Sequence, residues 1–355
     1  MATTSLRSFA ARARGPLADR YVGAVLLVLL ALTPYLVLTT ALAPLQPLIA
    51  KDLGLSARTL QLTTGMANAA YAVGAVVAVQ IGSRVAPRRM LVLYAALFVA
   101  GSVLAAWAPV SGLFIAGHVV QGLATGLMLI GSVPPLVLSW GTDKLRSTAI
   151  VMNLGIFGAV ALGPVVGGVA AGTGTWRPLL WIFAGLGAAA LAFALLTYED
   201  ADPQDPDAPV DVIALVLATG GCAAAFFGVS ELMGRRVTDP VVLGPVVAGI
   251  AMLVLLVVHQ WRSDDPLIPM RKIAHTVPVV AIVIAMSAGA ASVALVQLAQ
   301  TSLQAKGASP EHAGMLFWPE FGLAFVAALI FSRLYFTRWT PVLAFSGLAL
   351  LAAGG

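Results

Sequence analysis

Long apolar runs follow one another along almost the whole chain, separated by short polar breaks. An α-helix needs about 20 apolar residues to cross the hydrocarbon core of a bilayer. Ten runs of this kind lie near residues 21–43, 61–81, 89–108, 112–139, 146–172, 177–197, 210–233, 241–260, 277–303 and 312–332. The pattern predicts an all-helical integral membrane protein with ten complete spans.

An eleventh apolar run starts near residue 340 and is still apolar at Gly355. No charged residue follows it. The sequence therefore predicts a partial eleventh span, and a chain that is a fragment of a longer protein.

The composition excludes an ordinary soluble domain. Of the 355 residues, 60% are hydrophobic and 10% are charged, and the mean hydropathy is +0.96. A soluble domain has about 25% charged residues. The single cysteine, Cys222, allows no internal disulfide.

The positions of the basic residues predict the orientation of the spans, because Lys and Arg accumulate in cytoplasmic loops. With the N-terminus inside, fourteen of the 20 Lys and Arg fall in cytoplasmic segments and six in external ones. The Arg-rich start resembles a signal peptide, but the apolar run after it is too long and many spans follow. We expect a multi-pass protein of the cell membrane with a cytoplasmic N-terminus.

One polar segment, residues 198–211, interrupts the apolar pattern. It holds six of the fifteen acidic residues and three prolines, and no basic residue. We interpret it as an extended, solvated cytoplasmic linker. The predicted organisation is an N-terminal six-helix bundle (1–197), the acidic linker (198–211), two extra central helices (212–260), a basic cytoplasmic loop (261–276) and a partial C-terminal bundle (277–355).

The fifth run and its continuation, residues 155–181, contain seven glycines and two prolines. In membrane helices small residues allow close approach, and a proline can bend the helix. Gly155, Ala159, Gly163 and Gly167 recur every four residues, so we expect one smooth stripe with Pro164 beside it. The pattern predicts two closely packed helices that must also move.

Several motifs resemble the major facilitator superfamily. Gly163-Pro164-x-x-Gly167-Gly168 is similar to the fifth-helix antiporter motif of proton-coupled drug exporters. Four further segments resemble the fourteen-helix drug:proton antiporter branch: residues 46–54, Gly117-His118-x-x-Gln121-Gly122, residues 264–269 and residues 309–314.

The order of the spans also fits this family, in which two six-helix bundles flank a central path. The resemblance implies a major facilitator-type helical bundle. It also implies multidrug efflux, in which a small amphipathic or hydrophobic compound is exported by proton antiport with alternating access.

Polar side chains inside the spans are the candidates for function, because each is costly in a membrane unless it faces protein or water. Three spans carry polar residues at helical spacing, and we expect these stripes to line a shared substrate cavity. The alternative left open is hydrogen bonding between helices. The candidates are Thr64, Asn68, Tyr71, Gln121, Thr125, Gln297, Gln300, Thr301 and Gln304.

Two titratable groups in the spans are candidates for proton coupling. His118 occupies a position where the resemblance implies an arginine, and an imidazole, unlike a guanidinium, can titrate near neutral pH. Glu320 follows Trp318-Pro319 in the tenth run. The alternative for His118 is that it only replaces the arginine as a hydrogen-bonding group. The alternative for Glu320 is that it lies near the outer membrane interface and pairs with a nearby residue. Glu231 is expected to pair with Arg235 at the membrane interface.

Arg84, Arg88 and Arg89 fill the loop after the second run, where the resemblance implies a gating motif with an Asp and several basic residues. No Asp or Glu occurs between Asp52 and Asp143, so that acidic partner is absent. The acid of the family's first helix would fall near Leu38 and is also absent. We interpret the arginines as topology anchors, and these departures weigh against proton coupling by the family's usual residues.

Other classes of function have less support. The chain has no metal-spaced His/Cys cluster, phosphate-binding Gly-Lys loop or nucleophile–base pattern, so we expect neither an enzyme nor a cofactor or metal site. The alternative is a degenerate, non-transporting membrane relative with a sensing or assembly role. The expected partners are a small-molecule substrate, protons and the lipid bilayer, with no nucleic acid, and the expected state is a monomer.

Overall fold

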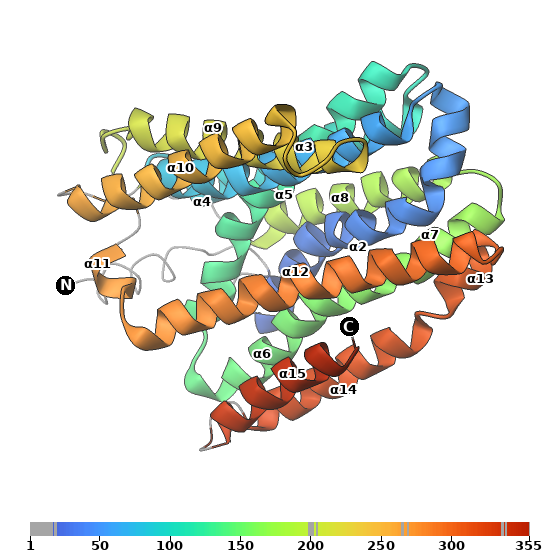
Figure 1. Ribbon diagram of the computed structural model, residues 1–355. Coiled ribbons are helices and arrows are strands. Elements are labelled where there is room, and N and C mark those ends of the chain that lie inside the picture. The colour runs from blue at the N-terminus through green and yellow to red at the C-terminus, as the bar shows by residue number, and fades with distance from the viewer. Residues whose placement is uncertain are drawn as a thin grey trace. The chain divides into compact units, whose positions relative to one another are not determined.

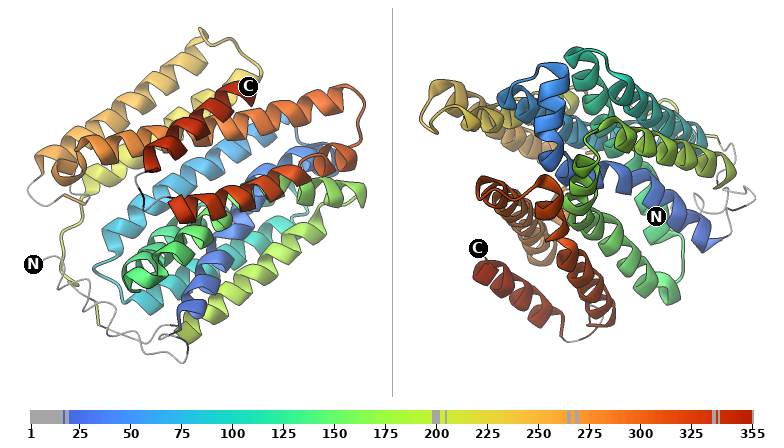
Figure 2. Two further views of the ribbon diagram at one scale, coloured as in Figure 1. Left: turned by 90° about the horizontal axis from the view of Figure 1, so that it is seen from below. Right: turned by 90° about the vertical axis from the view of Figure 1, so that its right-hand side faces the viewer.

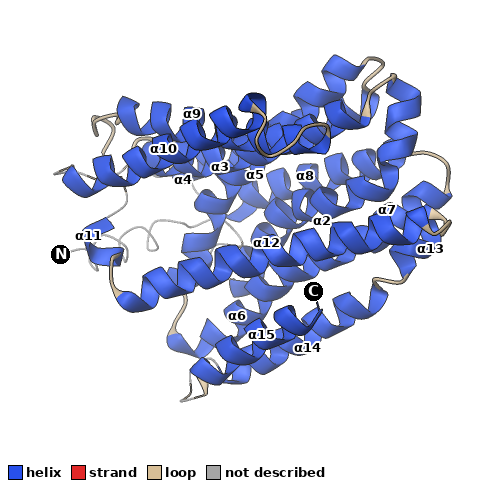
Figure 3. Cartoon of the chain, in the orientation of Figure 1, coloured by secondary structure: helices blue, strands red, loops and turns tan. Residues whose placement is uncertain are grey.

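The computed structural model describes residues 17, 20–197, 202–203, 205–263, 266–267, 270–334, 337 and 339–354. The start of the acidic linker and Asp264-Asp265 lie outside the described residues. Within these ranges every regular element is a helix and no strand is present (Figure 3). Ten helical segments are long and apolar enough to cross a membrane, which confirms the predicted spans.

The elements follow the predicted order. The ten spans are α2 (Tyr21–Leu53), α3 (Ala57–Ile81), α4 (Pro87–Trp107), α5 (Ser111–Leu138), α6 with α7 (Leu145–Asn153 and Ala159–Gly172), α8 (Arg177–Thr197), α9 (Val212–Ser230), α10 (Pro240–Arg262), α12 (Thr276–Ala305) and α13 with α14 (Pro310–Met315 and Trp318–Leu334). The shorter elements are η1 (Thr142–Lys144), η2 (Leu154–Gly158), η3 (Glu231–Met233), α11 (Met270–Ile273) and α15 (Thr340–Gly354), which contains the partial eleventh run.

The first span is longer than its apolar run predicts. The run ends near residue 43, but α2 continues through Pro44 and Pro47 to Leu53. Gly54 ends the helix with a φ of 63°, and its N–H bonds to the Ala50 carbonyl. Glycine adopts this left-handed conformation without steric cost, so the capping residue rather than the end of the apolar run sets the helix end.

The chain divides into two compact units. One comprises Met1–Tyr35, Ile49–Trp140 and Arg177–Pro269, and the other comprises Leu36–Leu48, Gly141–Trp176 and Met270–Gly355. The first unit therefore contains α3, α4, α5, α8, α9 and α10, and the second contains α6, α7 and α11–α15. The middle of α2 belongs to the second unit. The domain boundaries inferred from the sequence remain a prediction.

The two extra central helices form a hairpin that packs on α3 within the first unit. α9 and α10 lie side by side (Figures 1 and 2). A Cβ atom on Gly249 of α10 would lie 2.5 Å from the Ala225 backbone nitrogen of α9. On α3, a Cβ atom on Gly65 would touch the Ser230 hydroxyl of α9. Both helix contacts therefore depend on the absence of a side chain.

Glu231 binds one end of this hairpin to α3. Its side chain is fully buried, and its oxygens accept hydrogen bonds from the Arg58 guanidinium at 3.2 and 2.5 Å. Arg235 Nε donates to the same carboxylate at 3.2 Å. The predicted pair with Arg235 is confirmed. Arg58, which lies 173 residues from Glu231 along the chain, was not predicted.

Replacing Glu231 by glutamine is expected to lower the melting temperature of the purified full chain by several degrees. The variant leaves Arg58 and Arg235 without their shared charged partner, which is more costly at a buried site than at the surface. Lys144→Ala removes an exposed pair, Lys144–Asp143 at 3.8 Å, and should change the melting temperature little. Equal shifts in the two variants would contradict a role for Glu231 in holding the hairpin.

Candidate functional site

A cluster of polar and aromatic side chains lies inside the first unit and is centred on His118 of α5. The His118 ring is 2% exposed. It is stacked on Phe114 with ring centroids 6.2 Å apart, and the Tyr35 ring of α2 lies 5.9 Å away. His118 Nδ1 and Gln121 Oε1 are 3.1 Å apart. His118 and Gln121, two candidates given different roles by the sequence, are therefore in contact.

Gln121 connects this histidine to α4. Its Nε2 donates to the Ser102 hydroxyl at 2.9 Å, and all three side chains are buried. In this amide orientation, His118 Nδ1 carries the hydrogen. With the amide flipped, Gln121 would donate to Nδ1 and Ser102 would donate to Gln121. The contacts of Gln121 with His118 Nδ1 and with Ser102 are kept in both arrangements.

Tyr35 joins the cluster to α3, and it is a residue that the sequence analysis missed. Its hydroxyl donates to Asn68 Oδ1 at 3.2 Å, and its ring stacks on Tyr71 with an interplanar angle of 12°. A Cβ atom on Gly122 would lie 2.9 Å from the Tyr35 hydroxyl oxygen. The glycine of the predicted fourth-span motif therefore makes room for this tyrosine. A polar ring in the middle of a largely apolar run was the available signal.

Three of the remaining cavity candidates, all threonines, donate hydrogen bonds within their own helices. Thr64 and Thr125 donate to carbonyls of their own helices, at Leu60 and Gln121. In the second unit, Thr301 of α12 is exposed and donates to the carbonyl of Gln297.

Gln300 of α12 differs from these candidates. It is 2% exposed, and neither amide atom has a hydrogen-bond partner in the described part of the chain. Gln297 and Gln304, on the same helix, are half-buried. A single cavity shared by the three polar stripes remains a prediction.

Glu320, the second proton-coupling candidate, lies in the first turn of α14 in the second unit. It is half-buried, and its backbone N–H bonds to the Phe317 carbonyl. The adjacent rings of Trp318 and Phe321 lie 5.8 Å apart. Its role in proton coupling remains a prediction.

The glycines of the fifth-span motif make close contacts with α2 inside the second unit. A Cβ atom on Gly163 would touch the Thr40 hydroxyl and lie 2.5 Å from the Val37 carbonyl oxygen. On Gly167 it would lie 2.7 Å from the Ala41 Cα. No side chain larger than hydrogen fits at Gly163 or Gly167 unless the helices separate.

The same motif also contacts α13. A Cβ atom on Gly168 would lie 2.9 Å from the Gly314 Cα, and one on Gly314 would touch the Pro164 carbonyl oxygen. Two faces of α7 are therefore packed closely at the motif, one against α2 and the other against α13.

A π-helical turn, η2, precedes the motif between α6 and α7. A π-turn holds more residues than an α-turn and shifts the phase of the side chains that follow. Gly155 lies in this turn, whereas Ala159, Gly163 and Gly167 lie in α7, and all four residues are buried. The predicted four-residue stripe thus crosses a change of helical period, and it remains a prediction.

The predicted gating-loop arginines lie at the junction of α3 and α4. Arg84 is in the turn after α3, and Arg88 and Arg89 are in the first turn of α4. Arg84 and Arg88 are half-buried and Arg89 is exposed. Their role as topology anchors remains a prediction.

Asp211 fastens the end of the linker to three helices. Its carboxylate caps α9 through the Ala214 N–H at 2.9 Å and accepts from His259 and Gln260 of α10 at 2.9 and 2.8 Å. Its own N–H bonds to Gln80 of α3 at 3.2 Å. The interpretation of residues 198–211 as a solvated tether therefore does not extend to Asp211.

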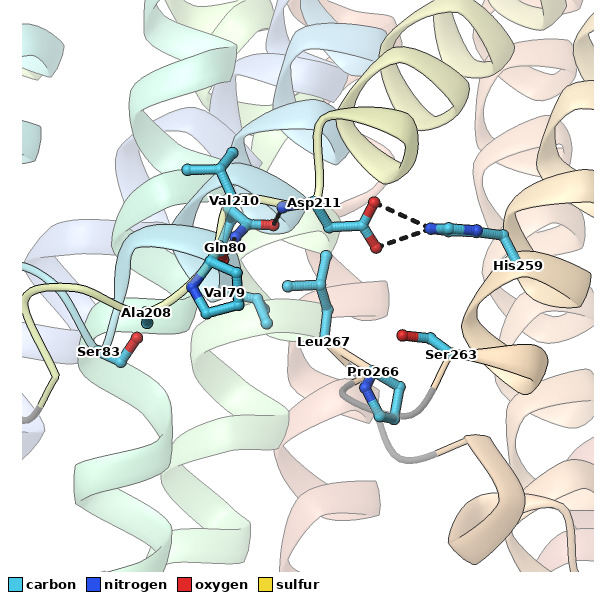
Figure 4. Close-up of a pocket in the computed structure, with 11 residues that line it drawn as sticks. Val79, Gln80, Ser83, Ala208, Val210, Asp211, His259, Ser263, Pro266 and Leu267 are labelled. Atoms are coloured by element: carbon cyan, nitrogen blue, oxygen red, sulfur yellow. Dashed lines mark hydrogen bonds and ion pairs between the residues drawn. The ribbon is translucent and has the colours of Figure 1, made fainter.

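A cavity of about 360 Å³ adjoins Asp211 (Figure 4). Its walls come from the end of α3, the end of the linker and the end of α10 with the segment that follows. The Asp211 carboxylate points toward His259 and already accepts from three protein donors. We therefore assign this acid to holding the hairpin in place.

The hydrogen bonds of Asp211 predict a pH-dependent contribution to stability. Partial burial raises the pKa of Asp211, but the bonds from Ala214, His259 and Gln260 outweigh it, and the net shift is downward. A carboxyl with a lowered pKa stabilises the fold above its unfolded pKa of about 4, and this contribution is lost as the pH falls through the folded value.

Asp211→Asn should therefore lower the melting temperature at neutral pH, and its difference from the wild type should shrink below about pH 4. Asp143→Asn, at an exposed position, is the control and should have little effect. A difference between Asp211→Asn and the wild type that is the same at every pH would contradict the assignment.

Comparison with known proteins gives one consistent family. A family model described as Major Facilitator Superfamily matches residues 15–355. The uncharacterized MFS-type transporter YubD of Bacillus subtilis is 27% identical over 314 residues, which cover 87% of this chain and 61% of that protein. The human organic anion transporter MFSD10 has a solved structure that covers 94% of this chain and is itself covered completely, with 15% identity and a TM-score of 0.43.

Several relatives carry names that refer to drugs. The multidrug resistance protein B homolog of Mycobacterium tuberculosis is 32% identical over 193 residues, which cover 53% of this chain and 35% of that protein. The tetracenomycin C resistance and export protein of Streptomyces glaucescens is 25% identical over 315 residues, which cover 85% of this chain and 56% of that protein. The matched part of this chain thus spans between about a third and three fifths of the length of these curated relatives.

Proposed function

The chain belongs to the major facilitator superfamily, and from this premise we propose that it exports a small amphipathic or hydrophobic compound in exchange for protons. The proposal places it in the fourteen-helix drug:proton antiporter branch. It acts in the cell membrane as a monomer with a cytoplasmic N-terminus. Relatives named for multidrug resistance and tetracenomycin C export support a drug-like substrate.

The observation that carries the proposal is the packing of the fifth span. The residues that resemble the antiporter motif are those at which α7 meets α2 and α13 without intervening side chains. Pro164 and the π-turn η2 add two irregularities to this one span. Such a helix can change its contacts while remaining helical, as alternating access requires.

His118 is the group we assign to proton transfer in the first unit. When Nδ1–H donates to Gln121 Oε1, this hydrogen bond is kept whether the imidazole is neutral or protonated at Nε2, so the ring can take up and release a proton with little rearrangement of Gln121. The ring contacts those of Phe114 and Tyr35. We assign Glu320 as a second candidate in the second unit.

Gln300 is the group we assign to substrate recognition on α12. A buried amide without a protein partner is destabilising unless another molecule supplies a donor or an acceptor. A largely apolar compound that carries at least one hydrogen-bonding group would satisfy it. This requirement fits amphipathic drugs better than hydrocarbons.

Export can be tested by producing the full chain in a bacterial host that lacks its own drug pumps. Cells loaded with ethidium or another lipophilic cation should lose the dye faster than cells that carry an empty vector. A proton ionophore should abolish the difference. Absence of efflux across a broad compound panel, with the protein present in the membrane, would favour the non-transporting alternative.

A further inference from the structure

The proline of the fifth-span motif leaves one backbone carbonyl without its usual donor. Pro164 lies inside α7 and has no N–H, so the carbonyl of Val160, four residues earlier, loses its intrahelical hydrogen bond. In a membrane such a group cannot turn to bulk water, and leaving it unpaired is costly.

Thr40 of α2 supplies the missing donor. Its hydroxyl donates to the Val160 carbonyl oxygen at 2.7 Å, and its side chain is 1% exposed. Gly163 makes this approach possible, because a Cβ atom there would touch the Thr40 hydroxyl. The proline and the glycine of the motif thus have complementary roles. Pro164 leaves a carbonyl without its helical donor, and Gly163 leaves the space in which the Thr40 hydroxyl approaches that carbonyl.

The Thr40 hydroxyl also has a second acceptor in its own helix. The Val37 carbonyl oxygen lies 3.4 Å away, at the distance limit of a hydrogen bond. If α2 and α7 separate, the hydroxyl can turn to Val37, as threonines in helices commonly do. The bond between the helices can therefore break without leaving the hydroxyl unpaired, which suits a contact that is made and released.

We propose that Thr40 is a positioning residue of the fifth-span motif, whose hydroxyl replaces the N–H that Pro164 lacks and holds α7 against α2. Its effect on transport rests on the proposed function. The hydrogen bond itself does not, so the two can be tested separately.

A double-mutant cycle on the purified full chain tests the hydrogen bond. Thr40→Val removes the hydroxyl and should lower the melting temperature. Thr40→Ser keeps the hydroxyl and should have a melting temperature close to that of the wild type. Pro164→Ala gives Val160 an intrahelical donor, so Thr40→Val should cost much less in that background. Thr39→Val is the control, because Thr39 donates to the Leu36 carbonyl of its own helix; its effect should be the same in both backgrounds.

Transport kinetics test the positioning role. Thr40→Val should lower the maximal efflux rate by roughly fivefold, the effect expected for one hydrogen bond, with KM unchanged, and Thr40→Ser should recover most of the rate. Equal costs of Thr40→Val in the wild-type and Pro164→Ala backgrounds would overturn the proposal, as would failure of Thr40→Ser to restore stability. If the wild type moves no compound, the proposed function fails. The double-mutant cycle on stability still decides whether the Thr40 hydroxyl donates to the Val160 carbonyl.

Discussion

Replacing Gly163 by valine is expected to reduce export to the level of cells without the protein. The new side chain would occupy the space of the Thr40 hydroxyl and approach the Val37 carbonyl, so α7 could not remain in contact with α2. The initial rate of dye efflux, normalised to the amount of protein in the membrane, measures the effect.

The matched control for this variant is Gly185→Val in α8. A Cβ atom on Gly185 meets nothing within 4 Å, so the same substitution there should leave efflux close to normal. Gly163→Ala adds the smallest possible side chain and should give an intermediate loss. If the Gly163→Val variant exports the dye at the wild-type rate, the assigned role of the motif is contradicted.

The second large effect is expected at His118. His118→Gln keeps a hydrogen-bonding side chain beside Gln121 but cannot titrate near neutral pH, so it should abolish efflux driven by a proton gradient. Binding of the compound should persist. Efflux rates at several external pH values measure the first outcome, and binding of the compound to the purified variant measures the second.

His275→Gln is the control for a general effect of removing a histidine, because His275 is exposed at the start of α12. Glu320→Gln tests the second candidate in the same way. If His118→Gln and Glu320→Gln both leave the pH dependence of efflux unchanged, the assignment of the proton sites is wrong.

The spans could be predicted because the length of an apolar run is a local property of the chain. The hydrogen-bond partners could not, since they come from distant segments. Arg58 reaches Glu231 across 173 residues, and the fold places Tyr35 and Ser102, from two different apolar runs, beside Asn68 and Gln121. The contact of His118 with Gln121 is local, because residues three apart on one helix share a face.

The fifth span illustrates a different limit. Its glycines and its proline could be identified from the sequence, and their spacing predicted a close contact. The π-turn at Leu154–Gly158 could not be predicted, because the analysis assumed a constant helical period. The donor for the carbonyl freed by Pro164 was also missed, since Thr40 lies 120 residues away on α2.

The most direct test of the central claim is the coupling of substrate movement to protons in sealed vesicles. The full chain is reconstituted into liposomes with a pH-sensitive dye inside, and a pH gradient is imposed across the membrane. The account predicts that ethidium, or another compound found in the efflux screen, accumulates against its concentration gradient while the pH gradient collapses, and that His118→Gln does neither. Movement of the compound by the wild type with no change in the pH gradient would contradict proton antiport.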